Sequence, residues 1–165
     1  MATFTTPQFA EDKYNDYMTP KHAWQDIQHL IPKKQIWEAF FGDSTSGDYL
    51  KELGFDVIHK DIDFYKNDLG EIIVSNPPFS DAKNILKRLK VLDKPFILLL
   101  PCSKLNTQYF RDTFKDLIQI IIPRKRIHFK KLVNGRVPEG WKNSCNFDTF
   151  YYCYKMDFKN DITWL

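Results

Sequence analysis

The order of segments in this chain predicts an α/β fold, a doubly wound and mostly parallel sheet with an antiparallel strand near its C-terminal edge. Apolar strand-like segments alternate with segments whose apolar residues recur at helical spacing. The segment Phe96 to Leu100 is apolar on both faces, as expected when helices cover both sides of a parallel sheet. Near the C-terminus, Asn134-Gly135 between Lys131-Leu132-Val133 and Arg136-Val137 signals a hairpin, and Phe147 to Met156 reads as a long aromatic strand.

The N-terminal half is expected to contain two helices and three strands. Lys21 to Ile31 is predicted as the first helix because its apolar residues recur at helical spacing. A turn from Gly42 to Gly47 leads to a short helix that ends at Gly54, a natural position just past a helix C-terminus. The three strands are predicted at Ile36 to Phe41, Phe55 to Lys60 and Glu71 to Ser75.

The C-terminal half continues the alternation of strands and helices. Ser80 can cap a helix from Asp81 to about Val91, which carries one apolar stripe. After the strand at Phe96, a second helix runs through Tyr109 and leads to a strand at Leu117 to Ile122.

Length and composition predict a single globular domain, 1–165, with residues 1–13 loosely ordered and no separate target-recognition domain. No apolar run approaches the roughly 20 residues needed to span a bilayer, and the polar N-terminus is not a signal peptide. Cys102, Cys145 and Cys153 lack CxxC spacing, and the four histidines lack ligand spacing. We therefore expect no metal site and a reducing compartment, cytoplasmic or host intracellular.

Asn76-Pro77-Pro78-Phe79 follows an apolar strand, and its residue types suit the activation of an amino group as a nucleophile. An adenine amino nitrogen is a poor nucleophile because its lone pair is delocalised into the ring. Two hydrogen-bond acceptors on its N–H groups free that lone pair, and the Asn76 side chain and the Pro77 carbonyl offer them. Phe79 offers a face on which a base can stack. The alternative is a strand-to-helix turn that happens to contain two prolines, but the carboxyl end of a strand is where α/β sheets bind ligands.

This tetrapeptide resembles the Asn/Asp/Ser-Pro-Pro-Tyr/Phe motif of the amino-methyltransferases that use S-adenosylmethionine (SAM). The chain is most similar to the small adenine-N6 DNA methyltransferases of phages and large DNA viruses, over about Tyr14 to Met156. The resemblance implies a Rossmann-like class I methyltransferase fold and methyl transfer to adenine N6 in DNA. It also implies catalytic roles for Asn76, Pro77, Pro78 and Phe79.

Tyr17-Met18-Thr19-Pro20 resembles the family's Tyr-x-Thr-Pro segment. Thr19 is a good N-cap and Pro20 a good first helical residue, and a helix N-terminus suits the carboxylate of SAM. The resemblance therefore implies that Tyr17, Thr19 and Pro20 bind the cofactor, although Thr-Pro also starts many helices that bind nothing.

The segment Trp37 to Ser44 resembles the first SAM motif, Asp/Glu-Pro-Phe-x-Gly-x-Gly. By that likeness Glu38 faces the methionine amino group, and Gly42 lets the backbone approach the cofactor. Ala39 stands where proline is usual and Ser44 where the second glycine is usual, so weaker or reshaped cofactor binding is expected. The alternative is an ordinary strand and turn with a buried glutamate. The cofactor residues implied here are Glu38, Phe40, Gly42, Asp43 and Ser44.

A second acidic segment follows the strand at Phe55 to Lys60. An acid at Asp61 suits the ribose hydroxyls of the cofactor, roughly 20 residues beyond the glycine turn. Asp63-Phe64 resembles the family's Asp-Phe segment, which serves the cofactor adenine. The roles of the two acids stay open, and a solvated acidic loop is the alternative. The residues implied here are Asp61, Ile62, Asp63 and Phe64.

Positive charge gathers around the predicted hairpin, and a net charge of +3 permits a polyanionic partner. A basic hairpin suits phosphates, although such a run is often only a solvated face. The expected nucleic-acid-binding residues are Arg124, Lys125, Arg126, Lys130, Lys131 and Arg136.

The first hypothesis is therefore a DNA adenine-N6 methyltransferase, with sequence selectivity from short loops, self-association as a homodimer, or a partner subunit. An RNA adenine methyltransferase shares the tetrapeptide chemistry. A catalytically silent subunit of a methyltransferase complex is the alternative from another class, and Ala39 and Ser44 favour it.

Overall fold

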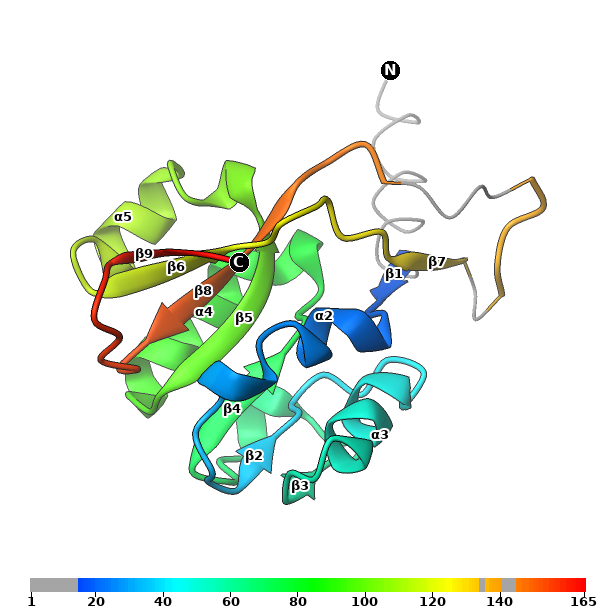
Figure 1. Ribbon diagram of the computed structural model, residues 1–165, viewed down its shortest axis with the longest axis horizontal. Helices are drawn as coiled ribbons and strands as arrows, with labels where there is room; N and C mark the ends of the chain where they lie inside the picture. The colour runs from blue at the N-terminus through cyan, green and yellow to red at the C-terminus, as the bar shows by residue number, and fades with distance from the viewer. Residues whose placement is uncertain (1–14, 134–135, 141–144) are drawn as a thin grey trace.

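The computed structural model describes residues 15–133, 136–140 and 145–165. Residues 1–13, predicted to be loosely ordered, and the predicted turn at Asn134-Gly135 lie outside the described residues. Two sheets are present in the described part, a main sheet of seven strands and a separate pair, β1 with β7. Figure 1 shows the pair beside the main sheet, away from both of its edges.

The main sheet has the strand order β3-β2-β4-β5-β8-β6-β9. All of its neighbouring pairs are parallel except those made by β8, which lies antiparallel between β5 and β6. The predicted fold class is therefore confirmed: a Rossmann-like α/β fold with a doubly wound, mostly parallel sheet and an antiparallel strand near its C-terminal end. The strands are β2 (Ile36–Trp37), β3 (Val57–Ile58), β4 (Ile72–Ser75), β5 (Phe96–Pro101), β6 (Ile118–Ile122), β8 (Thr149–Tyr154) and β9 (Ile162–Trp164).

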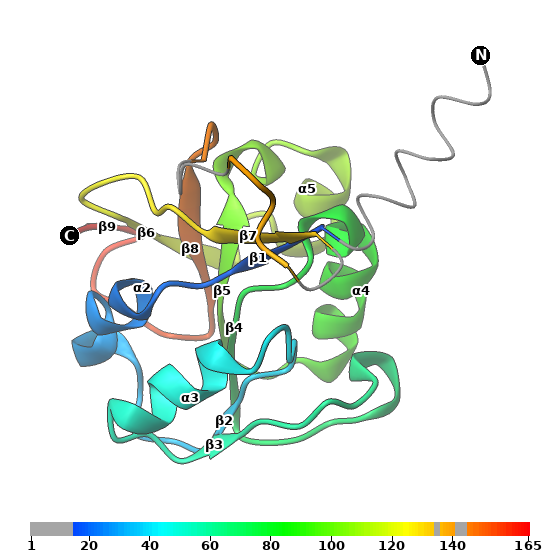
Figure 2. The ribbon, with the colours of Figure 1, turned by 90° about the vertical axis from the view of Figure 1, so that its right-hand side faces the viewer.

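Helices cover both faces of this sheet (Figure 2). α2 (Lys21–Gln25) and α3 (Thr45–Glu52) pack on one face, and α4 (Ala82–Leu92) and α5 (Gln108–Phe114) pack on the other. Successive strand residues alternate between the two cores, so that Ile72 and Val74 face α2 and α3 whereas Ile73 faces α4. Both faces of β4 and β5 are buried, as their apolar sequences predicted.

The second sheet joins segments that are far apart in the sequence. β1 (Asn15–Met18) pairs antiparallel with β7 (Lys130–Val133), and Tyr17 lies opposite Lys131. Val133 and Arg136 exchange backbone hydrogen bonds of 2.8 and 3.1 Å.

Several predicted element boundaries were wrong. The first helix ends at Gln25, and a 3₁₀ turn (Gln28–Leu30) carries the chain to Ile31, which Pro32 favours in an extended conformation. The turn after β2 is shorter than predicted because α3 already begins at Thr45.

Two predicted caps and the predicted last strand also need correction. α2 begins after an extended Pro20 without a side-chain cap, so Thr19 is not the N-cap. Ser80 lies inside a 3₁₀ turn (Phe79–Asp81) and does not cap α4. The chain does not close with β8, because β9 adds a parallel edge strand next to β6. Two further 3₁₀ turns span Phe64–Lys66 and Cys102–Lys104.

Candidate functional site

A cavity of about 320 Å³ opens where β2 and β4 end, within the range typical of small-molecule sites. It brings together most residues that the sequence nominated: Tyr17, Thr19, Glu38, Phe40, Gly42, Asp43, Asp61, Ile62, Asp63, Phe64, Asn76, Pro77, Pro78 and Phe79. Pro20 instead lines a neighbouring cavity, which shares Met18, Thr19 and Asp43 with the first. Ser44 lines neither of these two cavities.

Asn76 is held so that one of its polar atoms stays available. Its Nδ2 donates a hydrogen bond of 2.6 Å to the backbone carbonyl of Tyr17. This bond fixes the orientation of the amide, and Oδ1 is then a buried acceptor with no hydrogen-bond partner among the described residues. A buried acceptor without a donor is costly in a folded protein, and at a cavity such an atom can accept a hydrogen bond from a ligand N–H group.

Phe79 belongs to a cluster of four aromatic rings at the wall of the cavity. The Tyr17 ring stacks on Phe79 with centroids 5.7 Å apart and planes 19° apart. Phe129 and Phe147 meet Phe79 edge-on, at 5.9 and 5.7 Å. One face of Phe79, which the sequence nominated as a stacking platform for a base, is thus covered by Tyr17.

Glu38 lies fully buried just after β2, at the inner end of the cavity. Ser46 Oγ donates to one carboxylate oxygen at 2.5 Å, and Ser75 Oγ and the Phe40 N–H donate to the other. Burial raises the pKa of Glu38 to about 7, although these three hydrogen bonds oppose the shift. A ligand cation at this end of the cavity would favour the ionised carboxylate.

The Ser46 hydroxyl is oriented in turn by Trp24, whose Nε1 donates to Oγ at 2.9 Å. Trp24 comes from α2, Ser46 from α3 and Ser75 from the end of β4. α3 and β4 therefore each supply a hydroxyl to the carboxylate, and α2 orients one of the two hydroxyls.

The glycine turn has a left-handed backbone at two positions. Gly42 has φ of 57° and Ser44 has φ of 73°, a region that serine adopts only with strain. A Cβ at Gly42 would lie 3.1 Å from Met18 Sδ, so the thioether packs directly on this turn. Asp43 N–H also donates to the same sulfur at 3.3 Å.

Asp61 and Asp63, whose separate roles the sequence left open, differ in their hydrogen bonding. Asp63 Oδ1 accepts a 2.8 Å bond from the Tyr65 N–H and so begins a 3₁₀ turn. Asp61 is exposed and makes no hydrogen bond or ion pair to the residues that the structure describes. Phe64 is buried against Trp37 and Phe40, with centroids 5.6 and 4.8 Å away.

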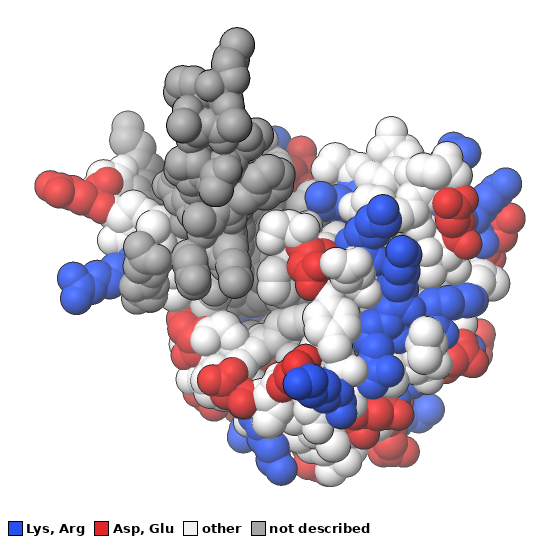
Figure 3. All heavy atoms as spheres, turned by 180° about the vertical axis from the view of Figure 1, so that it is seen from behind, with Lys and Arg blue, Asp and Glu red and all other residues white. Residues whose placement is uncertain are grey.

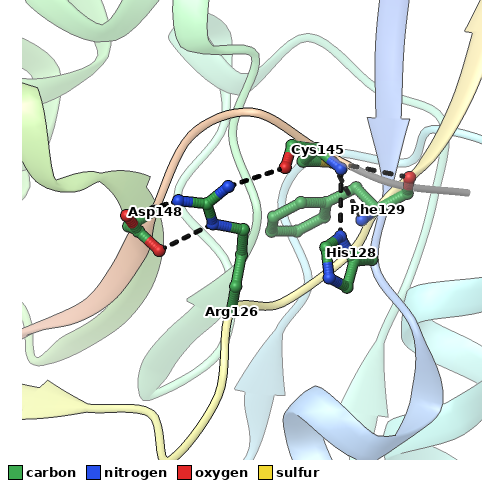
Figure 4. A network of polar contacts seen from close by, with 5 residues as sticks. All are labelled: Arg126, His128, Phe129, Cys145 and Asp148. Atoms are coloured by element: carbon green, nitrogen blue, oxygen red, sulfur yellow. Dashed lines mark hydrogen bonds and ion pairs between the residues drawn. The ribbon is translucent and has the colours of Figure 1, made fainter.

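Arg126 is committed to an ion pair at the base of β7 (Figure 4). Its Nε and Nη2 donate to the two Asp148 oxygens at 2.8 and 3.0 Å, and this partner lowers the pKa of the Asp148 carboxyl. Nη1 donates to the Cys145 carbonyl at 3.1 Å, and Cys145 N–H donates to His128 Nδ1 at 3.0 Å. Arg126 therefore joins the segment before β7 to the segment before β8. The other basic residues predicted here, Arg124, Lys125, Lys130, Lys131 and Arg136, make no ion pair within the described residues.

Sequence reasoning missed several residues of the site. Ser75 precedes Asn76 at the same strand end, so the rule that nominated Asn76 also pointed to it. Ser46 carried no signal, because its contact with Glu38 depends on how α3 packs. The Tyr65 hydroxyl, which donates to Asp81, bridges the acidic loop and the tetrapeptide turn, and both residues line the cavity.

Comparison with known proteins finds similarity in structure but not in sequence. No protein-family model and no curated protein sequence matches the chain. The crystal structure of TehB from Haemophilus influenzae matches 81% of this chain at 12% sequence identity, with a TM-score of 0.45. The match spans 62% of the TehB chain, and a likeness at this level says nothing about activity.

The described residues contain neither a membrane-spanning helix nor a cluster of metal ligands. None of their helices is long and apolar enough to cross a membrane. They contain no cluster of three or more His, Cys, Asp or Glu side chains that could hold a metal ion. All three cysteines are free, and Cys145 and Cys153 are buried.

Proposed function

We propose that this protein transfers a methyl group from SAM to the N6 amino group of adenine in DNA. The observation that carries the proposal is Asn76 Oδ1, a buried acceptor that finds no donor among the described residues and lies at a cavity next to Pro77 and Phe79. An exocyclic amino group offers the two N–H donors that such a turn needs, one for Asn76 and one for the Pro77 carbonyl. Because Tyr17 holds Nδ2, the acceptor is oriented before the substrate arrives.

The residues of the cavity fit SAM as the cofactor. Glu38 supplies a buried carboxylate for the methionine ammonium, and Asp61 supplies a carboxylate without a partner in the described part of the chain for the ribose hydroxyls. Asp63 is partly used by the Tyr65 N–H, which favours Asp61 for the ribose. Bound SAM would supply an electrophilic methyl group, and the chain's own task is to hold the amino nitrogen in line with it.

Nucleic acid is the proposed partner because exposed basic residues lie on β7 and in the segment that leads to it from β6. Arg124, Lys125 and Lys130 are exposed and lack ion-pair partners in the described part of the chain. The same chemistry on RNA is the second candidate, because phosphates and adenine occur in both polymers. The oriented Asn76 favours an active enzyme over a silent subunit, because its free acceptor lies at the cavity beside Pro77, where an amino group would need it.

The test is transfer of a labelled methyl group from SAM to duplex DNA, single-stranded DNA and RNA, followed by nucleoside analysis. We expect N6-methyladenine in DNA, and we expect Asn76→Ala to lose about 100-fold or more in kcat, the usual cost of removing one positioned hydrogen-bonding group. Asn106→Ala, at an exposed position, is the matched control. Full activity of Asn76→Ala would refute the mechanism, and N6-methyladenine in RNA alone would reassign the substrate.

The silent-subunit alternative has its own measurement. A protein that binds SAM is stabilised by it, by about 2.7 kcal/mol at a hundredfold excess over the Kd. Absence of any thermal shift with excess SAM, in a protein without transfer activity, would favour the silent subunit.

A further inference from the structure

Helix α4, which follows the tetrapeptide turn, carries four basic residues and no acidic residue. They are Lys83, Lys87, Arg88 and Lys90. Ala82, Ile85, Leu86 and Leu89 form the buried face of the helix, and Lys83, Lys87 and Lys90 are exposed. We call these three exposed residues the α4 lysine face. Figure 3 shows a band of lysine and arginine side chains on the side of the molecule that α4 and α5 cover.

This concentration of charge works against the stability of the helix. Lys83 and Lys87 are four residues apart and Lys87 and Lys90 three apart, so like charges are neighbours on the helix surface. Lys83 also stands in the first turn, where the helix dipole disfavours a cation. A helix whose surface were only solvated would gain from acids at such positions, and α4 has none.

Lys83 and Lys87 of the α4 lysine face are also not neutralised by an acid of the described protein. None of the described ion pairs includes Lys83, Lys87 or Lys90. The acids that bracket the helix are occupied, since Asp81 accepts from the Tyr65 hydroxyl and Asp93 pairs with Lys155. Of the three lysines, Lys90 has other roles within the described residues. Its charge adds to that of Lys155 in lowering the pKa of the Asp93 carboxyl, and its Nζ lies 5.6 Å from the ring centroids of Phe114 and Tyr154.

The position of the helix places this charge beside the candidate site. Asp81 and Ile85, at the start of α4, line the cavity. Tyr17 and Met18 of β1 line the same cavity, and their partners on β7 are Lys131 and Lys130. The cavity therefore lies between two elements that carry lysines. Seven residues separate Lys83 from Lys90, which is about 10 Å along a helix and enough to meet more than one phosphate.

We infer that the α4 lysine face binds the phosphodiester backbone of the nucleic acid that flanks the target nucleotide. The inference deepens the proposed function and rests on it for the identity of the polymer. It differs from the surface that the sequence predicted, which lies around β7, because it places phosphate contacts on the other side of the cavity as well. Phosphate contacts of this kind set affinity and position, and they carry no sequence preference.

The experiment compares the full-length protein with two double variants that lose the same charge. Lys83→Gln with Lys87→Gln removes the two lysines of the α4 lysine face that make no ring contact. Lys33→Gln with Lys34→Gln is the matched control, at two exposed positions before β2. Binding to a fluorescent duplex of random sequence is measured by anisotropy between 50 and 300 mM salt, and SAM binding is measured by calorimetry on the same samples.

Removing one phosphate contact should reduce the slope of log K against log salt by about 0.9 in magnitude, so the slope for the α4 variant should fall by about 1.8. At 0.1 M salt this corresponds to about eightfold weaker binding per lysine. The control variant should keep the affinity and slope of the wild type, and SAM binding should be unchanged in both. This readout needs no catalysis, so it can succeed or fail independently of the methyl-transfer test.

An α4 variant with wild-type affinity and slope would overturn the inference, whatever the enzyme's activity. So would an equal loss of affinity in the control variant, since that would show only a general effect of net charge. Binding through these lysines to vesicles containing phosphatidylserine, without binding to DNA, would likewise refute it. If the α4 variant binds DNA more weakly but the wild type transfers no methyl group, the α4 lysine face would stand as a DNA-binding surface. The proposed methyltransferase activity would then be wrong.

Discussion

Replacing Glu38 by glutamine removes a charge that the folded protein holds in its core while keeping the shape of the side chain. The pKa of Glu38 rises from its ordinary value of 4.5 to about 7, with burial as the largest cause. Between pH 4.5 and 7 the folded protein therefore binds a proton that the unfolded chain releases. The free energy of unfolding falls as pH rises through this window, and the full shift is worth about 3 kcal/mol.

The assay is urea unfolding of wild type and Glu38→Gln at pH 5 and pH 8. Integrated over that range, Glu38 should make the wild type lose about 2.5 kcal/mol that the variant does not lose. The comparison across pH cancels any constant cost of disturbing the bonds to Ser46 and Ser75. Glu139→Gln, at an exposed position, should follow the wild-type pH dependence.

The result that would refute the reasoning is a pH dependence of Glu38→Gln stability equal to that of the wild type.

The ionisation of Glu38 should also affect the affinity for SAM. If Glu38 pairs with the methionine ammonium, it must be ionised, and the Kd of the wild type should rise about tenfold from pH 8 to pH 6. If Glu38→Gln is more stable than the wild type and binds SAM equally tightly, the Glu38 carboxylate does not pair with the methionine ammonium.

Two further substitutions test the glycine turn and α3 by chemical denaturation. Ser44→Gly should stabilise the protein by roughly 0.5–1 kcal/mol, because serine is strained at φ of 73°, whereas Ser103→Gly, at an ordinary φ, should destabilise it; a destabilised Ser44→Gly would contradict the left-handed turn. Gly47→Ala should destabilise by about 1–3 kcal/mol, because the new Cβ would lie 2.2 Å from His59 Nδ1. Combining it with His59→Ala should restore part of the loss, and no restoration would place the strain elsewhere.

The sequence predicted best those elements whose order is fixed by strong local patterns. β4, the tetrapeptide and α4 lie close to their predicted places because a fully apolar strand, two prolines and a single apolar stripe each favour one local structure. The β1–β7 pair was not predicted as a sheet, since its partners are far apart in the sequence and pair only after the chain has folded. Thr19 shows the same limit, because a good capping residue is instead buried, with Oγ1 unpartnered among the described residues.

In the candidate site, too, the sequence predicted individual residues but not the contacts that hold them. Asn76 could be nominated from its type and position, but the reason that Oδ1 is available is the Tyr17 carbonyl, which β1 brings to the cavity. Glu38 could be nominated by resemblance, whereas the serines that hold it come from α3 and β4.

Ala39 and Ser44, which differ from the usual residues of the first SAM motif, leave the geometry of the site intact. Ser44 adopts the left-handed backbone that a glycine would adopt, and so the turn keeps its shape at a cost in stability. Ala39 is buried beside the cavity without disturbing Glu38. A chain that had lost cofactor binding would gain stability by losing the buried carboxylate at Glu38 and the unsatisfied acceptor at Asn76. Both are present here, together with the hydrogen bonds that orient them, and this costly combination favours an active site over a silent one.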